Sequence, residues 1–254
     1  MKTKKIFKLP IALFLFLYFL YLLVSSAPAA WAAWAAHKAV PSLWLNNVEG
    51  TLWSGRAKLA QIDMGAESLA LGELRWELSP WTLLIAKPCM KFETLLPNQQ
   101  ISGSFCQSVF GQSTLSDFNA DLPVENLSSI LPVQALGPIS LQVLEASFDG
   151  DARIESLDAR LSWQQARVHN GDKWMSLGSF AAKAKADEQG GVQADVFDLD
   201  GPYKSALVAR WSAGQAWVVD GTITPQEGAD ELVVQGLQLL GEDLGDGSYR
   251  VQWP

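Results

Sequence analysis

Histidine is nearly absent from this sequence of 254 residues, since only His37 and His169 occur. That count excludes a metal site built from two or three histidines of one chain. A serine or cysteine hydrolase would have to use His169 as its general base, and this is kept as an alternative. The chain also lacks a phosphate-binding loop, a dinucleotide fingerprint, a nucleophile elbow and the ligand spacing of a zinc site. We therefore predict a protein that is not an enzyme, with no catalytic residues, no cofactor and no metal.

Basic residues are scarce beyond the N-terminus. Four of the 19 lysines and arginines (Lys2, Lys4, Lys5 and Lys8) lie within the first eight residues, so the remaining 15 face all 27 acidic residues in the rest of the chain. This balance provides no basic stripe for a phosphate backbone, which excludes nucleic acid as a partner. With 48% hydrophobic residues, the chain is also too apolar to be disordered.

The N-terminal segment is long and uncharged. Residues 9–36 contain no charged side chain, and their first part is dense in Leu, Phe, Ile and Tyr. A helix over 9–30 would be about 33 Å long, enough to cross a hydrocarbon core of about 30 Å. The lysines before it and the negative charge after it predict a cytoplasmic N-terminus. We expect a basic tail over 1–8, a transmembrane helix over 9–30, a linker over 31–47 and an exported β domain over 48–254.

A cleaved signal peptide is the alternative for the same segment. It would show the same lysines and apolar run, and Ala27 and Ala29 are small residues of the kind that a signal peptidase reads. Under both readings the C-terminal domain is exported.

The rest of the chain has the pattern of strands. Helical periodicity is scarce after residue 36, and apolar residues alternate with polar ones between Gly, Asp and Asn. Strands are expected over 69–78, 157–168, 192–199, 206–211 and 215–223. Short helical turns fit 80–84 and 124–131. The predicted fold class is mainly β, with a single N-terminal transmembrane helix followed by an antiparallel β domain.

A weak internal repeat is found at an offset of 87 residues. Gly50 then aligns with Gly137, and Trp76 aligns with Trp163. A true repeat would give two similar β lobes that share one sheet, and chance similarity is the alternative.

The two cysteines, Cys89 and Cys106, lie at equal distances from the turn dipeptide Pro97-Asn98. In a hairpin with that turn, residues whose numbers sum to 195 face each other, and the two cysteines meet this condition. Directly opposite Cβ atoms are close enough for a disulfide, which an oxidising compartment favours. The sequence therefore predicts a disulfide, with two buried free thiols as the alternative.

Four short stretches stand out in the sequence, at 48–57, 74–84, 236–241 and 247–251. Their distinctive residues are Gly50, Trp53, Gly55, Trp76, Pro80, Gly241 and Tyr249. Together the stretches resemble the N protein of the bacterial type II secretion system, the GspN family. The order and spacing of the stretches support the resemblance more than any one motif does, and residues 110–200 contribute little.

The resemblance implies an accessory inner-membrane component of the machinery that moves folded periplasmic proteins across the outer membrane. It implies a single-pass protein of the bacterial inner membrane with its C-terminal domain in the periplasm. The expected partners are other inner-membrane and periplasmic subunits of that system and the inner membrane itself, with no small-molecule substrate. The family is also described as similar to β-groove proteins of the AsmA type. This likeness leaves a lipid-handling envelope protein with an apolar β groove as the alternative function.

Overall fold

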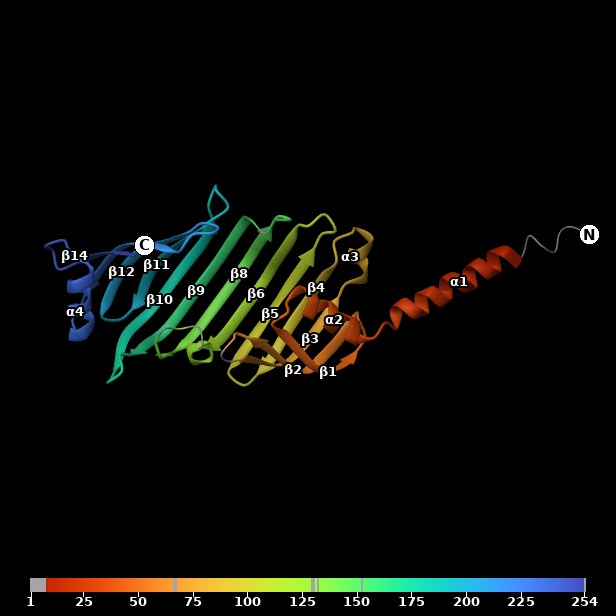
Figure 1. Cartoon of the computed structure of the whole chain (residues 1–254), viewed down its shortest axis with the longest axis horizontal. Coiled ribbons are helices and arrows are strands. Elements are labelled where there is room, and N and C mark those ends of the chain that lie inside the picture. Colours follow the sequence, from red (N-terminus) through yellow and green to blue (C-terminus); the bar gives the residue numbers. More distant parts are fainter. Residues whose placement is uncertain (1–7, 66–67, 129–130, 132, 152, 254) are drawn as a thin grey trace, which may run out of the picture.

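The computed structural model describes residues 8–65, 68–128, 131, 133–151 and 153–253. Within these residues one continuous sheet of 15 strands accounts for most of the chain (Figure 1). Its first strands are β1 (Leu43–Gly50), β2 (Ser54–Asp63), β3 (Ser68–Leu78), β4 (Cys89–Leu96), β5 (Gln99–Gln107), β6 (Ser113–Pro123) and β7 (Ala135–Leu136). The others are β8 (Pro138–Phe148), β9 (Ile154–His169), β10 (Trp174–Ala186), β11 (Val192–Asp200), β12 (Tyr203–Trp211), β13 (Val218–Pro225), β14 (Glu242–Asp243) and β15 (Tyr249–Trp253).

The sheet is an antiparallel meander in which most strands pair with their neighbours in sequence. The order is β1 to β6, then β8 to β13, then β15 and β14, while the short β7 pairs with β9. This arrangement confirms the prediction of a mainly antiparallel β fold. The strands expected in β3, β9, β11 and β12 are found within a few residues of their predicted bounds.

One strand begins later than expected, because β13 starts at Val218 and not at Gln215. Gly214 turns the chain with a positive φ of 77°. The N–H of Gln215 donates to the carbonyl of Ser212 at 3.0 Å, so the residues before Val218 belong to the turn and not to the ladder.

The hairpin of β4 and β5 has the predicted two-residue turn at Pro97-Asn98. Asn98 has a positive φ of 61°, a conformation that Asn tolerates better than most residues. Leu96 pairs with Gln99 and Cys89 pairs with Cys106, so the register follows the sum of 195 along the whole hairpin. The two cysteines are joined by a disulfide in the structure.

The N-terminal segment forms two helices where one was expected. Helix α1 (Lys8–Ser25) projects away from the sheet, and α2 (Ala29–Ala39) packs on β1 and β2 (Figure 1). Pro28 is the N-cap residue of α2 and has extended backbone. Proline also disfavours helical backbone in the residue before it, which separates α1 from α2. Segment 31–47, expected as a linker, instead holds most of α2 and the first part of β1.

The apolar span is therefore shorter than the predicted one over 9–30, because the helix ends at Ser25. In the part of the chain that the structure describes, no helix combines the length and the apolar character needed to cross a membrane. Residues 1–7 of the expected basic tail lie outside the described residues.

Three short elements complete the fold. Helix α3 (Pro80–Leu84) and the 3₁₀ turn η1 (Val124–Leu127) lie where helical turns were expected, and residues 129–130 of the second expected turn are outside the described residues. Helix α4 (Glu231–Leu240) packs on β15 at the end of the sheet opposite α1 and α2 (Figure 1).

The two tryptophans that the 87-residue offset aligns make similar hydrogen bonds, although their acceptors are 84 residues apart. The Nε1–H of Trp76 donates to the carbonyl of Leu52 at 3.2 Å, and the Nε1–H of Trp163 donates to the carbonyl of Leu136 at 3.2 Å. Both tryptophans belong to the same continuous sheet, so the similar segments share one sheet.

Candidate functional site

Most of the residues that carry the family resemblance come together where α1 meets the sheet. Gly50, Trp53, Gly55, Trp76 and Pro80 all lie at this junction, on β1, β2, β3, the turn between β1 and β2, and the start of α3. Gly241 and Tyr249 are not part of it, because they lie beside α4 and on β15 at the opposite end of the sheet.

The turn between β1 and β2 is hydrogen-bonded to the end of α1 and to the residues that follow it. The Nε1–H of Trp53 donates to the carbonyl of Val24 at 2.8 Å, and the N–H of Leu52 donates to the carbonyl of Ala27 at 2.8 Å. Thr51 also forms an isolated β-bridge with Pro28. The carbonyl of Val24 also accepts the N–H of Ala27 at 3.2 Å, so the turn adds hydrogen bonds at the end of α1, where a helix leaves its last carbonyls incompletely satisfied.

The junction has a small apolar core around Trp76. The side chain of Trp76 is 4% exposed and packs with Ala29 of α2 and Ala57 of β2, which are also buried. Gly55 is required opposite it, since a Cβ there would lie 2.4 Å from Cζ2 of Trp76. Gly50 has a positive φ of 98°, which the tight turn needs and which glycine adopts without strain.

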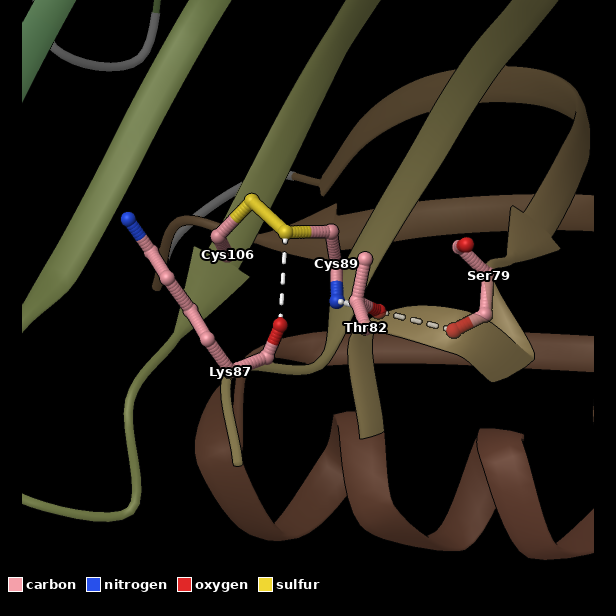
Figure 2. The surroundings of a disulfide bond; sticks show 5 residues. All are labelled: Ser79, Thr82, Lys87, Cys89 and Cys106. Atoms are coloured by element: carbon pink, nitrogen blue, oxygen red, sulfur yellow. Dashed lines mark hydrogen bonds between the residues drawn. A yellow bond between two sulfur atoms is a disulfide. The ribbon is translucent and has the colours of Figure 1, made fainter. Parts of the chain in front are cut away.

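Pro80 and the disulfide extend the junction to the next two strands. The N–H of Leu78 donates to the carbonyl of Trp53 at 2.7 Å, and Pro80 then opens α3 at a helix position that needs no N–H donor. Figure 2 shows the Thr82 hydroxyl donating to the carbonyl of Ser79 and accepting the N–H of Cys89. The disulfide-linked hairpin therefore holds α3 in place.

A prediction for this junction concerns Trp53. Phenylalanine at position 53 keeps an aromatic ring but removes the donor to Val24, so we expect a loss of about 0.5–1.5 kcal/mol. The expected result is faster protease cleavage between α1 and the sheet, measured by limited proteolysis of the full chain. Trp174→Phe, on the exposed part of β10, is the matched control and should leave the cleavage rate unchanged. Equal cleavage rates in the Trp53 variant and the wild type would contradict the prediction.

The other two residues of the family resemblance, Gly241 and Tyr249, lie where α4 packs on β15. Gly241 follows α4 and donates its N–H to the carbonyl of Leu237 at 2.8 Å. A Cβ at this position would lie 3.2 Å from the Cβ of the buried Tyr249. The hydroxyl of Tyr249 accepts a hydrogen bond from Gln238 at 3.3 Å, so the two residues serve the packing of α4 on β15.

The start of α4 is fixed by one carboxylate. Asp230 caps the helix by accepting the N–H of Leu232, and Lys173 donates to the same carboxylate at 2.8 Å. The backbone N–H of Asp230 donates to the hydroxyl of the buried Tyr203, and burial raises the pKa of that phenol. The hydrogen bond from Lys173, and next the one from Leu232, lowers the pKa of the Asp230 carboxyl.

This lowered pKa gives a pH prediction. A carboxyl with a depressed folded-state pKa stabilises the fold above the ordinary aspartate pKa of about 4, and that contribution is lost as the pH falls through the lower folded value. We expect the Asp230→Asn variant to lose stability relative to the wild type at pH 7, with the difference shrinking toward pH 3. Thermal melting across this range measures it, and Asp172→Asn in the nearby turn is the control. A difference that is constant with pH would contradict the assignment.

One face of the sheet is apolar across its central strands. A first row runs through Phe118, Val143, Ala159, Ala184, Ala194, Ala209, Val219 and Trp253, each paired with the next. A second row, two positions along each strand, runs through Ala120, Leu141, Leu161, Ala182, Val196, Leu207, Gly221 and Val251. Residues two apart in a strand share a face, so these two rows form one apolar strip.

Four residues of this strip (Ala120, Val143, Ala159 and Ala194) are buried, but the strip is not covered by the described helices. The helices contact the sheet at its two ends, and Figure 1 shows none over the central strands. The chain exposes 16604 Å², whereas a compact protein of its mass exposes about 11,000 Å². The protruding α1 and the open sheet both contribute to this excess.

The opposite face of the sheet is polar and carries charges of both signs. A hollow of about 800 Å³ over β1 to β6 is lined by charged side chains that include Glu49, Arg56, Arg75 and Glu93. Hydrogen bonds, first from Lys58 and next from Arg56, lower the pKa of the Glu49 carboxyl. These ion pairs are solvent-exposed and contribute little to stability, so this face is suited to polar contacts with a partner.

Sequence reasoning missed two parts of this arrangement. It did not identify the backbone carbonyls of Val24 and Ala27 as the groups that the turn binds, because main-chain acceptors leave no sequence signal. It also did not locate the apolar strip, although the alternation within single strands was visible. Among the described residues, no three His, Cys, Asp or Glu side chains gather in a group that could hold a metal.

Comparisons with known proteins identify a family model and two relatives that match most of the chain. Residues 41–252 match the family model of type II secretion system protein N. The type II secretion system protein N of Aeromonas hydrophila is 27% identical over 225 residues, and that of Vibrio cholerae serotype O1 is 25% identical over 224 residues. Each alignment covers 82% of both chains. No solved structure matches the chain. The matched region contains the whole sheet except Trp253, the last residue of β15, and the chain belongs to the type II secretion system protein N family.

Proposed function

We propose that the protein is an accessory inner-membrane component of the type II secretion machinery, and that it takes part in the export of folded periplasmic proteins across the outer membrane. The observation that carries this proposal is the family match, which extends from before β1 to residue 252 in β15. The role is one of assembly and not of catalysis: α1 fixes the position of the protein, and the sheet offers surfaces to neighbouring subunits.

Helix α1 is the segment that we assign to the membrane, with the N-terminus in the cytoplasm and the sheet in the periplasm. Its large side chains from Leu13 to Val24 are apolar and exposed, which suits a lipid environment. Eighteen helical residues span about 27 Å, a few Å less than a hydrocarbon core of about 30 Å. Local thinning of the bilayer would make up this difference.

The edge of the sheet is the surface that we expect to contact other subunits. Strand β1 is the first strand of the sheet, so its outer edge is available for an added strand. The charged hollow lies next to it on the polar face and includes Glu49 of the same strand. A polar partner that pairs with the edge would therefore also reach the hollow.

Site-specific photocrosslinking in cells tests this proposal. A photoreactive residue replaces the exposed Asn46 on β1, and a matched one replaces the exposed Asp172 in the turn between β9 and β10. We expect position 46 to crosslink inner-membrane or periplasmic secretion subunits, identified by mass spectrometry of the membrane fraction, and position 172 not to do so. Recovery of phospholipid-transport proteins at position 46, or of no protein at either position, would contradict the proposal.

A lipid-handling role is the second candidate, and the open apolar strip is the observation that favours it. The strip crosses eight neighbouring strands and is wide enough in principle to cover acyl chains along the sheet. Native mass spectrometry of the full chain, released from detergent, tests this role. Co-purified phospholipid that is lost in a Leu161→Glu variant would support it, and a lipid-free protein would argue against it.

A further inference from the structure

Five large apolar side chains are exposed together on two adjacent loops. Trp81 and Leu84 of α3 are each 77% exposed, and Ile85 is 72% exposed. Val109 and Phe110, in the turn between β5 and β6, are 67% and 87% exposed. We call these five residues the loop patch. Single exposed apolar side chains are common, but a cluster of this kind marks a contact surface.

The two loops are held rigidly together. The N–H of Val109 donates to the carbonyl of Ala86, just after α3, at 3.1 Å. The N–H of Gln107 donates to the carbonyl of Pro88 at 2.9 Å, and the disulfide joins the strands that carry both loops. The side chains of the loop patch are therefore presented to solvent by a fixed scaffold.

The loop patch lies at the same end of the sheet as the exit of α1. Trp53 donates to Val24 in the last turn of α1 and accepts the N–H of Leu78, and α3 begins two residues later at Pro80. Figure 1 shows α1, α2 and α3 together at one end of the molecule, with α4 at the other. A surface that meets the end of α1 is therefore also close to α3.

We propose that the loop patch inserts into the surface of the bilayer that holds α1, at the boundary between headgroups and acyl chains. This inference rests on the proposed anchoring by α1. Tryptophan and long aliphatic side chains are typical of this boundary, and Lys87 beside Ile85 can meet lipid phosphate. The lipid surface is favoured over a protein partner because the anchor brings the patch to the membrane without any further component. The contact fixes the sheet upright on the membrane instead of leaving it on a free hinge.

Fluorescence quenching in vesicles tests this contact on the full chain. The protein is reconstituted in vesicles of phosphatidylethanolamine and phosphatidylglycerol that carry a quencher on their acyl chains. A fluorescent amino acid is placed at position 110, at position 17 in α1, or at position 239 in α4. Leu239 is the matched control because it is 85% exposed, close to the 87% of Phe110, but lies at the far end of the sheet.

We expect quenching at positions 17 and 110 and none at 239. Trp81→Glu should reduce the quenching at 110 several-fold, while Leu239→Glu should leave it unchanged, with circular dichroism confirming that both variants are folded. Quenching at 17 without quenching at 110 would overturn the loop-patch contact and leave the anchor in place. Absence of quenching at 17 would overturn the anchor itself. Equal quenching at 110 and 239 would show that the sheet lies flat on the membrane and would also overturn the proposal.

Discussion

Replacing Trp76 with alanine is expected to lower the free energy of unfolding by about 3–5 kcal/mol. The indole is almost fully buried among Ala29 and Ala57, and its Nε1–H donates to the carbonyl of Leu52. Alanine would leave a cavity between α2 and the sheet and would leave this carbonyl without its donor. Urea-induced unfolding of the full chain in detergent, followed by circular dichroism, measures the loss.

Two further variants separate the causes of this effect. Trp76→Phe keeps most of the packing and removes the donor, so we expect it to cost less than Trp76→Ala. Trp217→Ala is the matched control, because Trp217 is 47% exposed, and its effect should stay within about 0.5 kcal/mol. A loss below about 1 kcal/mol in Trp76→Ala would mean that the residue is not part of a core.

Reduction of the Cys89–Cys106 disulfide is expected to cost about 3 kcal/mol. The bond closes a loop with a sequence separation of 17, and in the chain-entropy model a loop of this size restricts the unfolded chain by about that amount. Unfolding in urea with and without a reducing agent measures the difference. The register of β4 and β5 is set by the turn at Pro97-Asn98, so we expect the hairpin itself to persist after reduction.

A double variant provides the control for this experiment. Cys89→Ala combined with Cys106→Ala should unfold at the same urea concentration in both conditions, near that of the reduced wild type. A wild type whose unfolding does not respond to the reducing agent, although free thiols are detected, would contradict the prediction.

Both large effects concern the end of the sheet from which α1 departs. Trp76 joins α2 to the sheet, and the disulfide holds α3 beside the turn that grips α1. The end proposed to face the membrane is thus stabilised by a buried aromatic ring, a covalent bond and several main-chain hydrogen bonds. Such a rigid joint would transmit the position of the anchor to the whole sheet.

The sequence by itself determined the local features of this protein. Alternation predicted the strands, because residues two apart share one face of a strand. The turn at Pro97-Asn98 determined which residues of the hairpin are opposite, and the pairing of Cys89 with Cys106 followed from it.

Only the tertiary structure decided which side chains share a face over the whole sheet. Leu115 and Phe118 are three residues apart in β6, and strict alternation would place them on opposite faces. The positive φ of Asp117 coincides with a register shift between β5 and β6 that brings both against the same cluster. A register shift between β8 and β9 does the same for Val143 and Ala146. The hydrogen bonds from the turn to the carbonyls of Val24 and Ala27 were also decided at this level, because the Trp53 side chain is 29 residues from Val24, and the Leu52 N–H is similarly far from Ala27. Such contacts depend on how the chain packs, and the periodicity of a single strand does not predict them.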